Sequence, residues 1–381
     1  MTVIFPRRWG GLVLLLAVLP AAVCNGKEEP SVDEGDGSLT QLAEFKRRLH
    51  PDRSLAAWRE EGFAFPEQRG PEFEALRVDK AESVHKPLRL DARGMSQERF
   101  STIELNHQPL VIDNIPEVYD WKAASWTIPM LAEKFPTLNL RVKHEDKGPI
   151  KVPMADFARY VDVQKDDDPM LVFDDFIYND EIGKTLMAQY TVPDIFSEDL
   201  WQLAKGHKNY PAYRWLLIGP KRSGSAPHND PLGTSAWNTL ITGRKLWFLA
   251  PPYFEDIVDN TDDVNVIKWF IEELPKLSAK YRDDFMMYVQ HPGETMLVPS
   301  FWMHAVLNLD DTIAITQNFV STHTFPEAWE LARDHEPNFA QSWLQELVVH
   351  REDLGLMALR MNASKRRQMR IQQQMASDGE I

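Results

Sequence analysis

Residues 227–238 read Pro-His-Asn-Asp-Pro-Leu-Gly-Thr-Ser-Ala-Trp-Asn, and residues 301–309 read Phe-Trp-Met-His-Ala-Val-Leu-Asn-Leu. They supply a His-x-Asp pair, His228 and Asp230, and one distant histidine, His304. In an extended segment, residues two apart point to the same face, so His228 and Asp230 can bind one metal ion together. Two imidazoles and one carboxylate are the ligands of mononuclear non-haem Fe(II) sites that keep further coordination positions open. The pattern therefore predicts an Fe(II) site, and a site of this kind is typical of an oxygenase.

An apolar segment between these two stretches carries a lysine. Lys245 begins the run Lys-Leu-Trp-Phe-Leu-Ala, which reads as a strand. A lysine is unfavourable in a buried sheet unless an anion meets it, so Lys245 is a candidate ligand for a carboxylate. Alternatively, Lys245 lies in solvent on an edge strand. Downstream, the period of two in residues 312–320 places Thr316 and Asn318 on one face, where a hydroxyl and an amide need polar partners.

Five motifs together resemble the Jumonji-C (JmjC) family, and especially its arginine demethylase and lysyl hydroxylase branch. The similarity extends more loosely upstream to about residue 86. The motifs are His228-x-Asp-Pro-Leu-Gly-Thr-Ser-Ala-Trp-Asn238, Gly243-x-Lys245, Pro292-Gly-Glu-Thr, Trp302-x-His304 and Asp311-Thr-Ile-Ala-Ile-Thr-Gln-Asn-Phe319. The resemblance implies a mainly β fold, a double-stranded β-helix (cupin-like jelly roll), with flanking N-terminal and C-terminal helices.

The resemblance also implies the cofactors and the residues that hold them. The cofactors are Fe(II) and, as co-substrate, 2-oxoglutarate. The implied metal ligands, which are also the catalytic residues, are His228, Asp230 and His304. Lys245 and Thr316 would contact the distal carboxylate of 2-oxoglutarate, and the other residues of the co-substrate pocket would be Asn238, Asn318 and Ser225. Ser225 stands where the family branch carries threonine, and Met303 stands where it carries the second of two tryptophans.

Three functions are compatible with these residues. By resemblance, the protein would be a dioxygenase that uses O2 to hydroxylate a side chain of a protein or peptide substrate, or to demethylate it through hydroxylation. A second interpretation is a catalytically silent JmjC-fold binding or scaffold protein of the secretory pathway. A third is a cupin-like module that binds sugar or metal, which leaves Lys245 and Thr316 unexplained. The presence of every implied metal ligand together with Lys245 favours the enzyme.

Composition limits the domain count and the partners. The 381 residues, 43% of them hydrophobic, suit one large core with appendages. A formal net charge of -15 makes direct nucleic-acid binding unfavourable. A cationic protein or peptide substrate fits this charge better.

The N-terminus reads as a cleaved secretory signal peptide. Arg7 and Arg8 precede the apolar run 12–19, and a proline and small residues lead to Asn25. The run is too short to span about 30 Å of hydrocarbon, so we expect no transmembrane span after cleavage. Cys24, the single cysteine, would leave with the signal. The expected location is the endoplasmic reticulum lumen or the exterior. The expected organisation is signal peptide 1–24, acidic linker 25–38, N-terminal helical extension 39–85, JmjC/cupin-like catalytic domain 86–335 and C-terminal helical tail 336–381.

Patterns in the flanking segments predict further elements. Helical spacing of apolar residues predicts short helices over 39–58, packed on the outside of the barrel, and a helical tail over 338–361. By resemblance, this tail could form a homodimer. Other expected elements are a buried strand at 108–113, helices at 128–135 and 152–161, and a strand at 170–173. Residues 362–364 form a glycosylation sequon, which matters only in the secretory pathway.

Acidic residues after the helix candidate at 152–161 and one histidine near the end of the barrel are also noted. The run Asp166, Asp167 and Asp168 predicts a solvated loop. The acids that follow it either face solvent or meet a cationic side chain at the mouth of the barrel; these acids are Asp174, Asp175 and Asp180. His323 follows the strand of Thr316 and Asn318 closely, and for that reason it is singled out from the other histidines.

Overall fold

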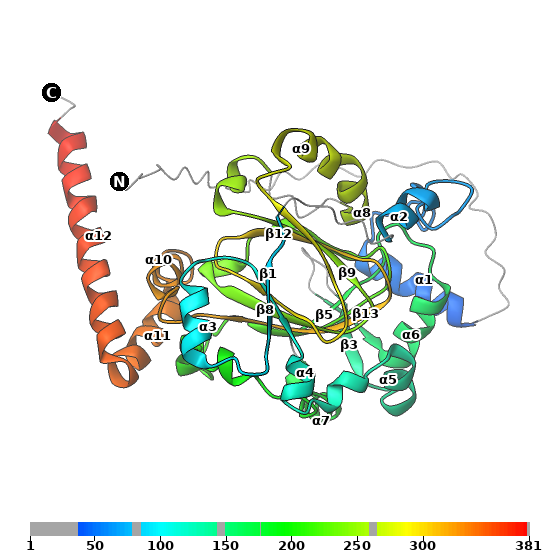
Figure 1. The fold of residues 1–381 in the computed structure, drawn as a ribbon, viewed down its shortest axis with the longest axis horizontal. Helices are drawn as coiled ribbons and strands as arrows, with labels where there is room; N and C mark the ends of the chain where they lie inside the picture. Colours follow the sequence, from blue (N-terminus) through cyan, green and yellow to red (C-terminus); the bar gives the residue numbers. More distant parts are fainter. Residues whose placement is uncertain (1–36, 78–84, 143–148, 176, 259–264, 379–381) are drawn as a thin grey trace, which may run out of the picture.

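The computed structural model describes residues 37–77, 85–142, 149–175, 177–258 and 265–378 (Figure 1). The expected signal peptide, its Cys24 and residues 25–36 of the expected linker lie outside this part of the chain. Within the described ranges, no helix is long and apolar enough to cross a lipid bilayer. Two β-sheets form the centre of the molecule, and helices surround them (Figure 1).

The two sheets differ in size but face each other. The large sheet has nine strands, which in spatial order are β1 (Leu88–Asp91), β2 (Leu110–Asp113), β11 (Thr295–Val298), β8 (Ser235–Thr242), β13 (Thr312–Phe319), β6 (Arg214–Gly219), β5 (Val172–Asp174), β3 (Asn139–Val142) and β4 (Ile150–Pro153). The small sheet has four, β10 (Met286–Gln290), β9 (Lys245–Ala250), β12 (Met303–Asn308) and β7 (Gly224–His228). This architecture confirms the expected cupin-like jelly roll with flanking helices.

The period of two decides what each strand of the small sheet presents to the interior. All residues of β9 and β12 are buried, because one face meets helices and the other faces the large sheet. The outward residues Leu246, Phe248, Met303, Ala305 and Leu307 pack in one apolar cluster with residues 266–277. The inward positions of the same strands therefore carry the polar side chains of the site.

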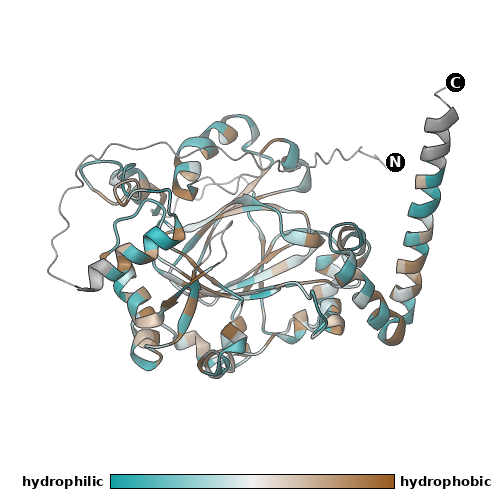
Figure 2. Cartoon of the chain, turned by 180° about the vertical axis from the view of Figure 1, so that it is seen from behind, coloured by the Kyte–Doolittle hydropathy of each residue, from teal (hydrophilic) through white to brown (hydrophobic). Residues whose placement is uncertain are grey.

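Helices cover the outer faces of both sheets. Figure 1 shows α1, α5 and α6 at one end of the molecule and α10, α11 and α12 at the other, with α12 extending away from the body. Figure 2 shows hydrophilic and hydrophobic residues alternating along the outer helices. The helices are α1 (Gly37–Leu49), α2 (Gly70–Arg77), α3 (Gln97–Glu104), α4 (Ile115–Val118), α5 (Ile128–Lys134), α6 (Met154–Val163), α7 (Glu181–Met187), α8 (Val266–Lys268), α9 (Leu274–Tyr281), α10 (Phe325–His335), α11 (Pro337–His350) and α12 (Glu352–Asp378).

Asp166 and Asp167 of the acidic run are buried, so the prediction of a solvated loop was wrong for these two residues, whereas the Asp168 side chain is 40% exposed. Asp166 and Asp167 are both 0% exposed. The Lys46 ammonium of α1 lies 2.6 Å from an Asp166 carboxylate oxygen. The Asp167 carboxylate accepts hydrogen bonds from three backbone N–H groups, those of residues 61, 62 and 63, at 2.8, 3.2 and 2.8 Å. Buried carboxylates need such partners, and sequence cannot show them because they come from more than 100 residues away.

Other predicted elements were confirmed with small shifts. The strand expected at 108–113 is β2, and the helix expected at 128–135 is α5, with a proline in its first turn. The helix expected from Val152 begins at Met154, because Pro153 ends β4 and holds the preceding residue extended. The predicted tail is two helices, α11 and α12, and Asn362 of the sequon lies inside α12, where its side-chain oxygen accepts a hydrogen bond from Trp329 Nε1 at 3.2 Å.

Candidate metal and co-substrate site

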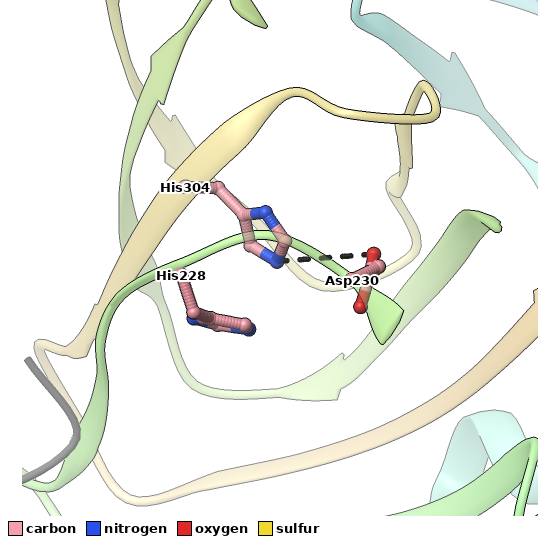
Figure 3. A group of neighbouring side chains, drawn as sticks. All are labelled: His228, Asp230 and His304. Atoms are coloured by element: carbon pink, nitrogen blue, oxygen red, sulfur yellow. Dashed lines mark ion pairs between the residues drawn. The ribbon is translucent and has the colours of Figure 1, made fainter. Parts of the chain in front are cut away.

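The fold brings together the three residues expected to bind metal. His228 ends β7, Asp230 lies two residues later, and His304 lies on β12 directly opposite His228 in the antiparallel pairing. One ligand atom from each residue lies within 4.8 Å of the others. The two imidazole centroids are 4.2 Å apart, and His304 Nε2 lies 4.0 Å from Asp230 Oδ2 (Figure 3). This spacing suits three ligands converging on one cation.

Hydrogen bonds orient both histidines for coordination through Nε2. His228 Nδ1 lies 2.7 Å from the carbonyl oxygen of Ala226, and His304 Nδ1 lies 3.0 Å from that of Trp302. A carbonyl oxygen only accepts hydrogen bonds, so each Nδ1 carries the proton and each Nε2 presents a lone pair. This assignment follows from the hydrogen-bond partners.

The carboxylate of Asp230 fits a metal because it lacks a donor. Its Oδ2 atom is buried and has no hydrogen-bond partner among the described residues. A buried acceptor without a donor is destabilising by roughly 1–3 kcal/mol, and more when it is charged. Two imidazole nitrogens and this oxygen form the donor set that suits Fe(II), so the residues present fit the metal.

Lys245 lies in the same interior and is well buried. Strand β9 pairs with β10 on one side and β12 on the other, so Lys245 is not on an edge strand, and it is 3% exposed. Burial lowers the pKa of its ammonium from 10.5 to about 8. In the described part of the chain, no hydrogen bond or ion pair to this ammonium is found. A buried cation without an anion is unfavourable, so this position suits an anionic ligand.

A cavity of about 740 Å³ connects these groups. It lies between the two sheets and is lined by every residue that the sequence assigned to the site, namely His228, Asp230, His304, Lys245, Thr316, Asn238, Asn318 and Ser225. Thr316 Oγ1 donates to the carbonyl of Trp237 at 2.9 Å, so the hydroxyl must rotate before it can donate to a carboxylate. The Asn318 amide donates to Thr234 Oγ1 at 2.8 Å, and the buried Oδ1 of Asn238 has no partner among the described residues.

Two asparagines that line the cavity were missed by the sequence analysis. Asn229 and Asn308 line the cavity, and the Oδ1 atom of each is buried without a hydrogen-bond partner in the described ranges. The period of two along β12 could have identified Asn308, because it lies four residues after His304 and so shares its face.

The outer wall of the cavity comes from the N-terminal extension. Leu49, His50, Arg53 and Trp58 line it, so the segment that was expected to pack on the outside of the barrel also contributes to the cavity. The Arg53 guanidinium lies 4.8 Å from the centre of the Trp58 ring and 3.3 Å from the carboxylate of Asp168, which also lines the cavity. The extension is held in place by the turn at 166–168, in which Asp166 and Asp167 are buried.

The acids that follow the turn have structural partners instead. Asp174 accepts a hydrogen bond from the backbone N–H of Arg141 at 2.9 Å, and Asp175 pairs with the Arg141 guanidinium at 3.1 Å. Asp180 caps α7 by accepting from the Gly183 N–H at 3.0 Å. These three acids do not line the cavity.

His323 lies outside the cavity. Its Nε2 is 2.6 Å from the hydroxyl oxygen of Ser101 on α3. This contact joins α3 to the segment that follows β13, so His323 has a role in packing.

A double-stranded β-helix with two histidines and a carboxylate converging in its interior defines the class of mononuclear non-haem metal oxygenases. Comparison with known proteins specifies the family. Residues 215–319 match the family model described as "JmjC domain, hydroxylase". That segment holds the three candidate metal ligands and Lys245.

Several relatives support this assignment. The Caenorhabditis elegans bifunctional arginine demethylase and lysyl-hydroxylase psr-1 is 33% identical over 279 residues, which cover 70% of this chain and 69% of that protein. The Arabidopsis thaliana lysine-specific demethylase JMJ21 is 35% identical over 245 residues, 61% of this chain but 25% of that protein. The Mus musculus 2-oxoglutarate and iron-dependent oxygenase JMJD4 is 31% identical over 156 residues, 39% of this chain and 36% of that protein. The chain belongs to the JmjC family of Fe(II)- and 2-oxoglutarate-dependent oxygenases.

Proposed function

We propose that this protein hydroxylates a side chain of a protein or peptide, or demethylates it through hydroxylation, with Fe(II), 2-oxoglutarate and O2. One observation carries the proposal. One cavity is lined by two oriented imidazoles, by an Asp230 carboxylate oxygen without a donor among the described residues, and by the buried Lys245 ammonium, for which those residues supply no anion. The metal cation would satisfy Asp230, and an anionic co-substrate would satisfy Lys245.

The proposed metal ligands are His228, Asp230 and His304. When bound, Fe(II) and 2-oxoglutarate supply the oxidising chemistry, in which O2 hydroxylates a substrate C–H bond while 2-oxoglutarate becomes succinate and CO2. The protein holds the metal through two Nε2 atoms and one carboxylate, and the carbonyls of Ala226 and Trp302 fix the ring orientations.

Lys245 is proposed to bind the distal carboxylate of 2-oxoglutarate. A charge-assisted hydrogen bond between an ammonium and a carboxylate is about twice as strong as a neutral one. Ser225, Asn238, Thr316 and Asn318 line the same cavity and would position the rest of the co-substrate.

The substrate would enter past the outer wall formed by the N-terminal extension. Phe173 on β5 and Trp215 on β6 also line the cavity, with tilted rings whose centroids are 5.3 Å apart. The carboxylate of Asp168 lines it too; this side chain is 40% exposed and pairs with Arg53. Aromatic faces and a carboxylate suit a cationic side chain. The net charge of -15 and the names of the relatives, an arginine demethylase and lysyl-hydroxylase among them, support such a substrate. The product depends on the carbon that is hydroxylated: a hydroxylated N-methyl group leaves as formaldehyde and frees the amine, whereas a hydroxylated chain carbon remains an alcohol.

The alternative function is a catalytically silent scaffold. A scaffold would have no need for the buried ammonium or the oriented imidazoles, so these groups favour the enzyme. The deciding experiment measures succinate release from 2-oxoglutarate by the purified protein with Fe(II), first alone and then with a library of lysine- and arginine-containing peptides. Release that increases with particular peptides is expected; no release under any of these conditions would favour the scaffold.

We propose further that the chain enters the secretory pathway after cleavage near Asn25 and acts in the endoplasmic reticulum lumen or outside the cell. The basic pair, the apolar run and the small residues that follow support this location. N-terminal sequencing of the native protein tests it, because an intact Met1 would contradict cleavage.

A homodimer through α11 and α12 is also proposed. Large apolar side chains are exposed on these helices, at 46% for Val348, 73% for Val349 and 46% for Leu356. Exposed apolar groups gathered on neighbouring helices are typical of protein interfaces.

A further inference from the structure

We infer that Asn308 is a positioning residue that directs the Lys245 ammonium at the distal carboxylate of 2-oxoglutarate. This inference rests on the proposed co-substrate site and adds a residue to it. It concerns one cluster, the Ser223 hydroxyl, the Asn308 amide and the Lys245 ammonium.

Asn308 and Lys245 are direct neighbours across two strands. They are paired in the antiparallel register of β12 and β9, which places side chains that share a face about 4.5–5.5 Å apart at Cβ. Both side chains line the cavity, and both residues are buried, at 0% and 3% exposed. The amide and the ammonium therefore share one face of the small sheet.

The Ser223 hydroxyl determines which way the Asn308 amide points. Ser223 Oγ donates its single proton to the carbonyl of Pro220 at 2.6 Å. Its remaining capacity is to accept, so the group that lies 2.9 Å away must be the Asn308 Nδ2 donor. The flipped amide would place two acceptor oxygens against each other. Close packing with Gly219 also holds this end of the amide, because a Cβ on Gly219 would lie 2.2 Å from Nδ2.

This orientation leaves the Asn308 oxygen facing away from Ser223 with an unused acceptor. Oδ1 is buried and has no hydrogen-bond partner within the described residues. Lys245, the residue paired with Asn308 across the strands, requires acceptors, because its ammonium has three N–H donors. A carboxylate in front of the lysine takes at most two of these donors. The third would donate to Asn308 Oδ1, which fixes the direction of the other two.

The other polar residues of the cavity wall do not supply the acceptor for the third N–H donor of Lys245. Asp230 belongs to the proposed metal site, and Arg53 lies on the outer wall with Asp168 and Trp58 as partners. Thr316 uses its proton on the carbonyl of Trp237. Asn308 is therefore the oriented neutral acceptor that lies in register with the ammonium.

The test compares the binding of two keto acids to the full chain with Mn(II) in place of Fe(II), followed by tryptophan fluorescence. The first is 2-oxoglutarate, and the second is 2-oxopentanoate, which has the same chain length but no distal carboxylate. Asn308→Leu removes the acceptor at similar volume. We expect it to weaken 2-oxoglutarate binding about tenfold and to leave 2-oxopentanoate binding unchanged, because only the distal carboxylate uses the oriented ammonium.

Two further variants separate positioning from packing. Asn308→Asp keeps the shape but places a carboxylate beside Lys245, so it should weaken 2-oxoglutarate binding more than Asn308→Leu does, by about a hundredfold. Ser223→Ala keeps Asn308 but removes the group that orients its amide, and it should weaken 2-oxoglutarate binding severalfold. Thermal melting of each variant shows that it is folded. If Asn308→Leu does not fold, the selectivity between the two keto acids in Ser223→Ala decides the question.

The outcomes distinguish this inference from the proposed function. Equal binding of the two keto acids by wild type, or binding of neither, would overturn the proposed co-substrate site itself. If wild type prefers 2-oxoglutarate and Lys245→Ala loses that preference, the site stands. An unchanged preference in both Asn308→Leu and Ser223→Ala would then overturn the role of Asn308 alone.

Discussion

At the residue scale, the interior of the barrel holds polar groups that lack partners within the described chain. They are a carboxylate oxygen of Asp230, the ammonium of Lys245 and the amide oxygens of Asn238 and Asn308. Each buried group of this kind is destabilising by about 1–3 kcal/mol, so an interior selected for stability alone would not keep them together. The Asp230 carboxylate requires a cation, the Lys245 ammonium requires an anion, and the two amide oxygens require hydrogen-bond donors. The cavity is therefore suited to a metal ion together with an anionic, polar ligand.

Replacing Asp230 tests the metal site. Asp230→Ala removes the single carboxylate of the proposed ligand set, so iron binding and turnover should be lost. The metal-free variant should melt at the same temperature as wild type or higher, because the deleted carboxylate oxygen has no donor in the described structure. Mn(II) titration and thermal melting measure the two effects, with Asp162→Ala, an exposed acid on α6, as the control. Wild-type turnover by Asp230→Ala in metal-controlled buffer would refute the assignment.

Replacing Lys245 tests the co-substrate anchor. Lys245→Ala leaves a bound carboxylate buried without its cation, which costs about 3 kcal/mol or more, so 2-oxoglutarate affinity should fall by about two orders of magnitude. Lys245→Arg should restore little, since a planar guanidinium differs in length and geometry from an ammonium. A 2-oxoglutarate titration with a redox-inert divalent metal measures both variants, and metal binding itself should persist. Equal affinity in wild type and Lys245→Ala would remove Lys245 from the site.

The lowered pKa of Lys245 predicts how co-substrate binding depends on pH. In the ligand-free protein this pKa is about 8, and only the protonated lysine attracts a carboxylate. Affinity for 2-oxoglutarate should therefore be constant below that pKa and fall above it, by up to about tenfold per pH unit. Titrations between about pH 6.5 and 9 measure this effect. Binding of 2-oxopentanoate should show no such fall, so a parallel fall for both keto acids would assign the titration to another group.

At the element scale, the N-terminal extension is a wall of the cavity, held by the turn at 166–168. Lys46 on α1 pairs with Asp166, and the Asp167 carboxylate accepts from three consecutive backbone N–H groups. Arg222 adds a hydrogen bond from its Nε to the carbonyl of Asp166 at 2.9 Å. The extension is thus joined to the barrel by buried charged contacts, and the outer part of the cavity depends on it.

The variant Asp167→Ala tests this connection. It leaves two buried N–H groups and one partly buried N–H group without an acceptor, so the free energy of unfolding should fall by about 3–5 kcal/mol. Limited proteolysis should cleave residues 50–65 faster, while 2-oxoglutarate affinity should change little because the metal triad and Lys245 belong to the barrel. Asp162→Ala, four to six residues away from the turn, is the matched control. Equal stability and equal protection of the extension in both variants would contradict the role of Asp167.

At the scale of the whole molecule, we expect a dimer because large apolar side chains are exposed on the C-terminal helices α11 and α12. The double variant Val349→Glu, Leu356→Glu places two charges on the exposed apolar surface, which should convert a dimer of 43.9 kDa chains to monomers. Size-exclusion chromatography with light scattering gives the mass. Val163→Glu introduces a charge at an exposed valine on α6, at 47% exposure, and should leave the dimer intact. A wild-type protein that elutes as a monomer would refute the proposal.

The amino-acid sequence alone determined the barrel and the candidate residues that line its interior cavity. Periods of two at 228–230, 301–309 and 312–320 identify strands and the side chains that share a face, because backbone pleating is a local property. Each residue that the sequence assigned to the site, from Ser225 to Asn318, lines the cavity. Applied along β12 as well, the same rule would have found Asn308.

Tertiary structure alone decided the remaining features. The run Asp166 to Asp168 looks solvated in sequence, because whether a carboxylate is buried depends on donors that come from distant segments, here Lys46 and the backbone of residues 61–63. The placement of Arg53 and Trp58 on the cavity wall has the same cause. The direction of the Asn308 amide depends on Ser223, 85 positions away. Local patterns report which face a side chain occupies, and only the folded chain determines what that face meets.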